Sequence, residues 1–284
     1  MIKFGPSGND EKFYLEGHKK TPEVFSWLKN MGLEIYEYSL GNGITLKRET
    51  AKLLGEEAQK NGIEMSVHAP YFINFANPSL EARQKSINYC INSLLLLGDF
   101  GGKKCVIHSG SCLKQERKEA LNVLYAGYDA LLQEVYKHDL QNFYLCPETM
   151  GKYQQIGSYE EIIDLCCLDK CLIPTLDFGH INCVEQGGLK TEDDFRKIID
   201  YSLKKLGSFK TQNLHIHFSK IEYSTKGEIK HLDLSDNLYG PNFEPLARVL
   251  KEYNLSPTVI CESKGKMATD ALILKNIYNK IKEE

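Results

Sequence analysis

The chain alternates short apolar runs with longer segments in which apolar residues recur at helical spacing. A short apolar run is typical of a strand buried in a parallel sheet, and a period of 3.6 residues is typical of a helix with one buried face. The apolar runs predict strands at 2–5, 33–38, 64–68, 104–108, 143–146, 173–176, 213–217 and 258–262. The intervening segments predict helices near 21–31, 45–61, 78–98, 115–138, 158–168, 191–206, 242–253 and 267–283.

Eight strands that alternate with eight helices predict an α/β fold, the (β/α)₈ or TIM barrel. At 284 residues the chain suits one such barrel, and no Gly/Ser linker or low-complexity tract divides it. We therefore expect a single domain over residues 1–284. The longest irregular stretch, 220–241, follows the seventh strand and is expected to form a functional loop at the C-terminal mouth of the barrel.

Residue types that bind metals stand at the ends of many predicted strands or just beyond them. In a barrel of parallel strands these ends meet at one mouth, so residues far apart in sequence converge. One histidine at a strand end is ordinarily structural, but repetition along the chain argues for a site. Eight such positions exceed the roughly four ligands of one zinc ion, which predicts a multinuclear centre. They are His68, His108, Glu148, Asp177, His180, His215, His231 and Glu262.

Charge and cysteine content limit the class of protein. The formal charge of −3 gives no global signature of a nucleic-acid binder, although a local basic patch would remain compatible with one. Nine cysteines are an odd number and most lie in apolar segments, so we expect reduced core thiols. The sequence shows neither a secretory leader nor an apolar run of membrane-spanning length, and we expect a cytoplasmic enzyme with no membrane partner.

Six segments of the chain form a joint pattern: SerValHisAlaProTyrPheIleAsn (66–74), ValIleHisSerGlySer (106–111), CysProGluThrMetGly (146–151), LeuAspPheGlyHis (176–180), HisIleHisPheSerLys (215–220) and IleCysGluSer (260–263). In this order and spacing they resemble the endonuclease IV family of abasic-site endonucleases, over nearly the whole chain. The resemblance implies a (β/α)₈ barrel with zinc as cofactor, in two or three ions, with manganese possible at one site. It implies hydrolysis of double-stranded DNA on the 5′ side of an abasic site, in base-excision repair, and no obligate protein partner.

Position by position, the resemblance implies three metal sites. The first is held by His68, His108 and Glu148, and Glu148 bridges to a second ion bound by Asp177, His215 and Glu262. The third is held by His180 and His231. The family completes it with an aspartate two residues before the last histidine, where this chain has Ile229; Glu228 is the expected substitute, and His217 is another candidate.

The resemblance also implies roles in catalysis and DNA binding. Glu148 and Glu262 are expected to position the ions or the attacking hydroxide, with Glu262 also handling its proton. The residues expected to contact DNA are Tyr71, Asn74 and Lys220. Tyr71 would insert near the lesion, or would be an ordinary aromatic residue of the barrel mouth. The loop at 39–43, SerLeuGlyAsnGly, is short and lacks the full set of basic and amide residues usual in the family.

Two other functions compete with this hypothesis. A sugar isomerase or epimerase barrel would need one metal, for which Glu148, Asp177, His215 and Glu262 suffice. That alternative explains the weak DNA-binding loops but not the additional histidines. A catalytically silent nucleic-acid-binding barrel would retain Tyr71 and the lysines without requiring Glu148.

Overall fold

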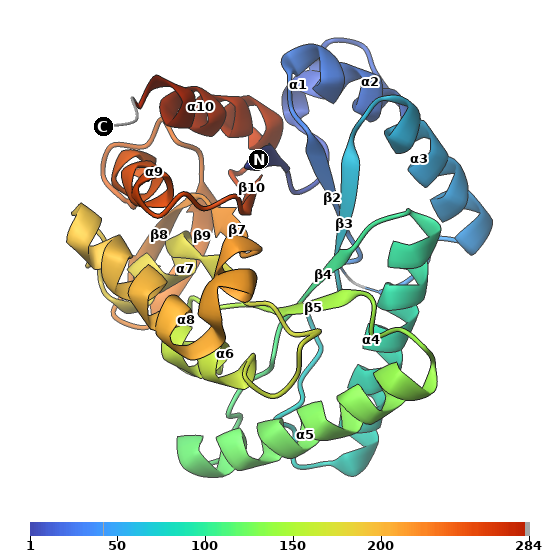
Figure 1. The fold of residues 1–284 in the computed structure, drawn as a ribbon, viewed down its shortest axis with the longest axis vertical. Helices are drawn as coiled ribbons and strands as arrows, with labels where there is room; N and C mark the ends of the chain where they lie inside the picture. The colour runs from blue at the N-terminus through green and yellow to red at the C-terminus, as the bar shows by residue number, and fades with distance from the viewer. Residues whose placement is uncertain (42, 282–284) are drawn as a thin grey trace.

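The computed structural model describes residues 1–41 and 43–281 and contains a closed barrel of parallel strands surrounded by helices (Figure 1). Two four-stranded parallel sheets, in the orders β1-β10-β7-β6 and β2-β3-β4-β5, form the wall. Parallel bridges between Ser7 and Glu37, and between Glu148 and Thr175, join the sheets at their two seams. The barrel strands are β1 (Lys3–Pro6), β2 (Ile35–Ser39), β3 (Glu64–His68), β4 (Lys104–Ile107), β5 (Tyr144–Pro147), β6 (Thr175–Asp177), β7 (His215–Phe218) and β10 (Thr258–Cys261).

Eight helices follow the barrel strands, as the helical periodicity predicts, and their apolar faces pack on the outside of the barrel. They are α2 (Pro22–Met31), α3 (Arg48–Lys60), α4 (Leu80–Asp99), α5 (Arg117–Lys137), α6 (Tyr159–Leu165), α8 (Glu192–Gln212), α9 (Phe243–Glu252) and α10 (Met267–Lys280). The expected end of the last helix at 283, like Asn42 in the loop at 39–43, lies outside the described residues. The predicted (β/α)₈ barrel is confirmed.

Three elements lie outside the predicted pattern. Two are the short helices α1 (Glu11–Leu15) and α7 (Phe178–Val184). The third is an antiparallel hairpin, β8 (Lys220–Ser224) and β9 (Gly227–Leu232), in the stretch expected to be an irregular loop. Both α7 and the hairpin stand at the C-terminal mouth, where they carry the possible metal ligands His180, Glu228 and His231.

The cysteines agree with the expectation of reduced thiols. All nine are free, and Cys167 is the one that is exposed. None of the described helices combines the length and the apolar character that a membrane crossing requires.

Candidate metal centre

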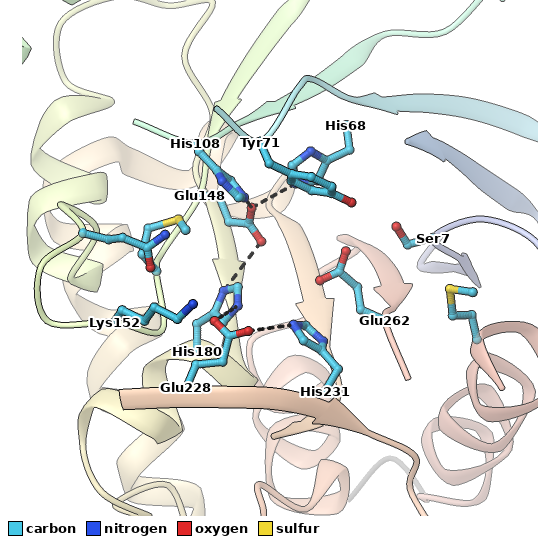
Figure 2. A pocket seen from close by; sticks show the side chains of 13 residues that line it. Ser7, His68, Tyr71, His108, Glu148, Lys152, His180, Glu228, His231 and Glu262 are labelled. Carbon is cyan, nitrogen blue, oxygen red and sulfur yellow. Dashed lines mark hydrogen bonds and ion pairs between the residues drawn. The ribbon is translucent and has the colours of Figure 1, made fainter. Parts of the chain in front are cut away.

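The C-terminal mouth of the barrel contains a polar pocket of about 400 Å³ (Figure 2). Its walls come from the ends of several strands and from the hairpin. The lining residues that can bind a metal are His68, His108, Glu148, His180, Glu228, His231 and Glu262. The structure therefore gathers at one mouth most of the side chains that the strand-end pattern singled out.

The first group of possible ligands is the one expected from the sequence. His68 ends β3, His108 follows β4 and Glu148 follows β5. The Nε2 atoms of His68 and His108 lie 3.2 Å and 3.1 Å from the same oxygen, Oε2 of the buried Glu148. Two imidazoles and a carboxylate that converge on one point are a suitable donor set for zinc.

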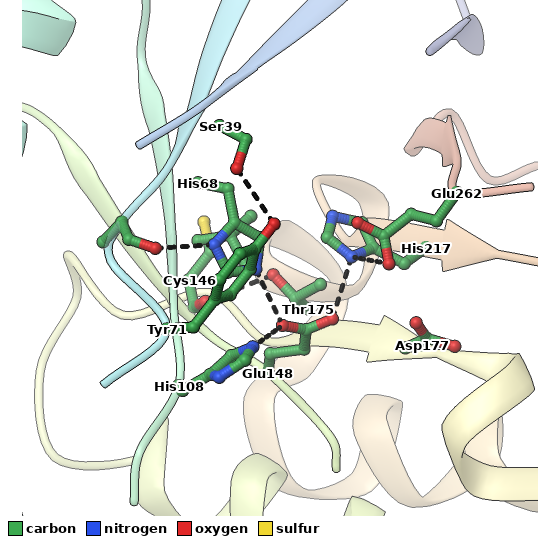
Figure 3. Close-up of polar contacts among 12 residues, drawn as sticks. Ser39, His68, Tyr71, His108, Cys146, Glu148, Thr175, Asp177, His217 and Glu262 are labelled. Carbon is green, nitrogen blue, oxygen red and sulfur yellow. Dashed lines mark hydrogen bonds and ion pairs between the residues drawn. The ribbon is translucent and has the colours of Figure 1, made fainter. Parts of the chain in front are cut away.

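The second group shares Glu148 with the first. The other oxygen of Glu148, Oε1, lies 2.8 Å from Nδ1 of His217, and that nitrogen lies 3.4 Å from Oε2 of Glu262 (Figure 3). Asp177 completes the set. Its Oδ1 caps the first turn of α7 through the backbone N–H of His180, whereas its buried Oδ2 has no hydrogen-bond partner among the described residues.

The structure corrects the expectation for His215. Residues two apart on a strand point the same way, so His215 and His217 both face the barrel interior, but His217 is nearer the C-terminal end. His215 lies one layer deeper, where its Nε2 is 2.8 Å from Glu37. His217, regarded from the sequence as a candidate for the third site, therefore takes the place expected for His215 beside Glu148, Asp177 and Glu262.

The third group contains Glu228, the expected substitute for the missing aspartate. Glu228 Oε2 lies 3.5 Å from Nε2 of His180, and Oε1 lies 3.7 Å from Nε2 of His231. A β-bulge makes this possible, because Glu222 pairs with Lys230 and Tyr223 pairs with Glu228, which leaves Ile229 as the extra residue. Ile229 is 53% exposed and points away from the pocket.

Close backbone contact holds the hairpin against the loop after β5. The Glu228 N–H donates to the Gly151 carbonyl at 2.8 Å. A Cβ atom on Gly151 would lie 2.8 Å from the His180 ring and 2.9 Å from Cβ of Glu228, too close for either to stay in place. Glycine at this position therefore lets His180 and Glu228 approach each other.

The hydrogen-bond partners of the histidine rings support a metal-binding role. In several of them one ring nitrogen contacts an oxygen outside the cluster, which leaves the other nitrogen directed at the carboxylates, as in protein metal sites. These contacts are His68 Nδ1 to the Ala69 carbonyl at 2.8 Å, His180 Nδ1 to the Thr149 carbonyl at 2.9 Å and His231 Nδ1 to the Ser219 hydroxyl at 3.0 Å. The buried Oδ2 of Asp177 accepts no hydrogen bond among the described residues and has Nδ1 of His180 as an ionic neighbour at 3.2 Å. Together these contacts fit bound cations.

Electrostatic interactions within the metal-free cluster are strong. Burial alone would raise the pKa of Glu148, but His217 and the hydrogen bond from His108 hold it well below its usual range. Burial dominates at Asp177, whose pKa is raised. Burial would lower the pKa of His180, yet Asp177 and Glu228 raise it to about 10. Positive charge at these nitrogens thus balances the buried carboxylates, a role that bound cations would take over.

The residues expected to contact DNA have different surroundings. Tyr71 is 49% exposed at the pocket rim, and its ring centroid lies 4.9 Å from that of His68. The Asn74 carbonyl oxygen Oδ1 accepts from the backbone N–H of Ala76 at 3.0 Å and of Ser111 at 3.3 Å, which gives it a role in loop structure.

Lys220 is the second correction. This side chain is buried, its Nζ donates to the Asp236 carbonyl, and it does not line the pocket. Two other lysines in the segments after β7 and β10 are in ion pairs, Lys230 with Glu222 and Lys266 with Asp233.

Two functional candidates, Lys152 and Glu37, escaped the sequence reasoning. Lys152 lines the pocket, and its charge adds to the larger effects of His180 and His231, which lower the pKa of Glu228 to about 2. Glu37 is fully buried and contacts both histidines of β7. A carboxylate in the middle of the apolar strand IleTyrGluTyrSer was the available signal for Glu37. His215 and His217 lie on the same face of β7, so the sequence favours neither as the ligand beside Glu148. Their different depths along the barrel axis distinguish them.

Comparison with known proteins identifies the family. Residues 25–277 match the family of xylose isomerase-like TIM barrels, and the chain belongs to it. A full-length relative is the uncharacterized protein MJ0133 of Methanocaldococcus jannaschii, 32% identical over 281 residues that cover 99% of this chain and 98% of the relative. The probable endonuclease 4 of Acholeplasma laidlawii is 27% identical over 202 residues, which cover 63% of this chain and 66% of that protein.

The chain shares its fold with solved structures of two kinds of enzyme. Endonuclease IV from Thermus thermophilus superposes with a TM-score of 0.67 at 18% identity, covering 93% of this chain and 96% of that one. A D-psicose 3-epimerase crystallised with D-fructose superposes with a TM-score of 0.66 at 15% identity, covering 98% and 96%. The fold alone is therefore compatible with either chemistry, and the side chains at the mouth have to distinguish them.

Proposed function

We propose that this protein is a metal-dependent phosphodiesterase that cleaves double-stranded DNA on the 5′ side of abasic sites. The observation that carries the proposal is that three groups of possible ligands, two of which share Glu148, meet at one mouth of the barrel. A fourth group, Glu37, His215 and His217, lies deeper inside. A single-metal enzyme needs only one of them. Low-identity relatives named probable endonuclease 4 and the similarity to the Thermus endonuclease IV structure support a DNA substrate.

The three groups define which residues would hold the ions. His68, His108 and Glu148 would hold the first, and Glu148, Asp177, His217 and Glu262 the second. His180, Glu228 and His231 would hold the third. Zinc is the expected metal because imidazole and carboxylate donors suit it, with manganese possible at one site. Bound divalent ions would lower the pKa of a bound water molecule and stabilise the negative charge of the phosphate.

The chain's own residues supply orientation and proton transfer. Glu148 has His68 and His108 beside one oxygen and His217 beside the other, so each oxygen is directed at one of the two groups of ligands. The Glu262 side chain is 15% exposed toward the pocket, which suits it to accept a proton from the attacking water. Tyr71 at the rim would stack on a base or sugar near the lesion, and Lys152 would attract the phosphate.

A sugar epimerase or isomerase is the second candidate. Glu148, Asp177, His217 and Glu262 form a complete single-metal set of three carboxylates and one imidazole. The burial of Lys220 also removes one expected DNA contact. This alternative gives no role to the group formed by His180, Glu228 and His231.

A nicking assay with metal analysis separates the two candidates. The full-length protein, loaded with Zn²⁺ or Mn²⁺, is incubated with a duplex that contains one abasic site, and its metal content is measured in parallel. We expect two or three ions per chain and a single nick 5′ to the site, abolished in Glu148→Gln and retained in the control Glu64→Gln, whose carboxylate pairs with Lys3 away from the mouth. One ion per chain, an intact duplex and epimerisation of a ketose would reject the nuclease.

A further inference from the structure

Glu37 is a fully buried carboxylate in the middle of β2, inside the barrel. Its Oε2 accepts a hydrogen bond from the Ser66 hydroxyl at 2.8 Å and lies 2.8 Å from Nε2 of His215. A charged group at this depth needs nearby donors to offset its loss of hydration. Ser66 and His215 account for one carboxylate oxygen only.

The other oxygen of Glu37 faces His217. Oε1 lies 2.9 Å from His217 Nε2, and neither atom has another hydrogen-bond partner among the described residues. On the far side of the ring, Nδ1 of His217 points at Glu148 and Glu262. The imidazole therefore stands between Glu37 and the second group of metal ligands.

This arrangement decides which nitrogen of His217 is available to a cation. A histidine binds a metal through an unprotonated nitrogen, and its other nitrogen then carries the proton and donates it to an outer acceptor. For Nδ1 to face the ion, the proton has to be on Nε2, where Glu37 is the acceptor in range. The corresponding acceptors for His68 and His180 are neutral backbone carbonyls, so Glu37 is the charged member of this outer set.

We propose that Glu37 is a positioning residue that holds the proton of His217 on Nε2 and so directs Nδ1 to the metal ion bound with Glu148, Asp177 and Glu262. The inference rests on the proposed metal centre but not on the nature of the substrate. His215 and Ser66 support it by fixing the opposite oxygen of Glu37. The chemical class of the ligand is a divalent cation such as Zn²⁺.

The substitution Glu37→Gln tests this role because it preserves shape and removes the acceptor. The amide oxygen would continue to accept from Ser66 and His215, which turns the amide NH₂ toward Nε2 of His217. Nε2 of His217 would then accept a hydrogen bond from the amide. The ring proton would move to Nδ1, the nitrogen that faces the ion, and would prevent it from binding the metal. We expect the affinity for this ion to fall about 10- to 100-fold, as for other outer partners of metal ligands.

The measurement is a competition titration of Zn²⁺ against a chelator on the full-length protein, with circular dichroism to verify folding. Glu64→Gln is the matched control, since it removes a β3 carboxylate that pairs with Lys3 outside the metal centre, and it should leave the affinity unchanged. Equal Zn²⁺ affinity of folded Glu37→Gln and wild type would overturn the proposal.

A second measurement needs no variant at Glu37 and so does not depend on its folding. In the zinc-loaded wild type, labelled with ¹⁵N-histidine and assigned with His217→Gln, we expect His217 to show a metal-bound Nδ1 and a protonated Nε2. A metal-bound Nε2, as in an ion held between Glu37, His215 and His217, would contradict the proposal. Failure of the nuclease hypothesis appears separately, as intact abasic DNA with zinc affinity and the His217 tautomer as expected.

Discussion

Glu228 and His231 face the same point of the pocket although they are three positions apart on one strand. In a regular strand an odd separation places two side chains on opposite faces. The bulge at Ile229 resets the alternation, so the carboxylate comes from position 228 and the side chain of 229 points to solvent. The third group of ligands thus depends on a backbone irregularity as much as on residue types.

The role of the bulge can be tested by moving the carboxylate from position 228 to position 229. Glu228→Ala should weaken binding of the third ion by at least about 100-fold, since a ligand matters more than its outer partners. The double variant Glu228→Ala/Ile229→Asp should be equally deficient, because position 229 faces away from His180 and His231. Metal content after gel filtration measures both. Recovery of the third ion in the double variant would show that the hairpin adopts a regular register.

His217 and His215 should differ sharply on substitution. His217→Gln removes a direct ligand of the second ion, so we expect loss of that ion and at least about a 100-fold fall in activity. His215→Gln keeps a donor near Glu37, and we expect at most about a tenfold loss of affinity. Elemental analysis and chelator titration compare the two variants, and a larger loss in His215→Gln would restore the assignment made from sequence.

Gly151→Ala should impair the third group of ligands selectively. The new methyl group would lie 2.8 Å from His180 and 2.9 Å from Glu228, so these side chains must separate. We expect the third ion to bind at least about tenfold more weakly, with the ion at His68 and His108 unaffected as an internal control. Parallel loss of every ion, or of none, would contradict this local effect.

We expect Lys152, rather than Lys220, to contact a DNA phosphate. Lys152→Gln should weaken binding of an abasic duplex and lower the slope of log affinity against log salt by about 1, the signature of one phosphate contact. Lys220→Met should leave that slope unchanged and reduce stability instead, because its Nζ donates to the Asp236 carbonyl inside the fold. Fluorescence anisotropy across a salt series distinguishes them, and a change of slope in Lys220→Met alone would reverse the assignment.

Lys104 should give the folding equilibrium a measurable pH dependence. Its Nζ donates to the Leu214 carbonyl and the Thr258 hydroxyl inside the barrel, and burial lowers its pKa to about 8. Between about pH 8 and its usual pKa of 10.5 the unfolded chain binds more protons, so the free energy of unfolding should rise with pH by up to about 3 kcal/mol.

Denaturant titrations at pH 8 to 10 on wild type and Lys104→Met measure this contribution. The difference between the two proteins cancels the other titrating groups, and the rise should be absent from the variant. Parallel pH profiles would show that Lys104 keeps its usual pKa in the folded protein.

The strand and helix pattern was sufficient for the fold. Each predicted barrel strand lies within two residues of its observed bounds at both ends, because a fully buried parallel strand has to be apolar and short. The same pattern missed the hairpin, whose strands are polar and partly exposed and so lack a continuous apolar run. Residues such as Glu228 and His231 were recognised by type, but their common direction was not visible in the sequence.

By itself the sequence determined the (β/α)₈ barrel and the concentration of His, Asp and Glu at one mouth, since these follow from local periodicity and from the parallel direction of the strands. The tertiary structure alone decided that His217 rather than His215 reaches Glu148, that Lys220 is buried and that Glu37 stands behind His217. The physical reason is that depth along the barrel axis and contacts across its interior depend on how distant strands align. The spacing of residues along one strand determines neither this depth nor these contacts.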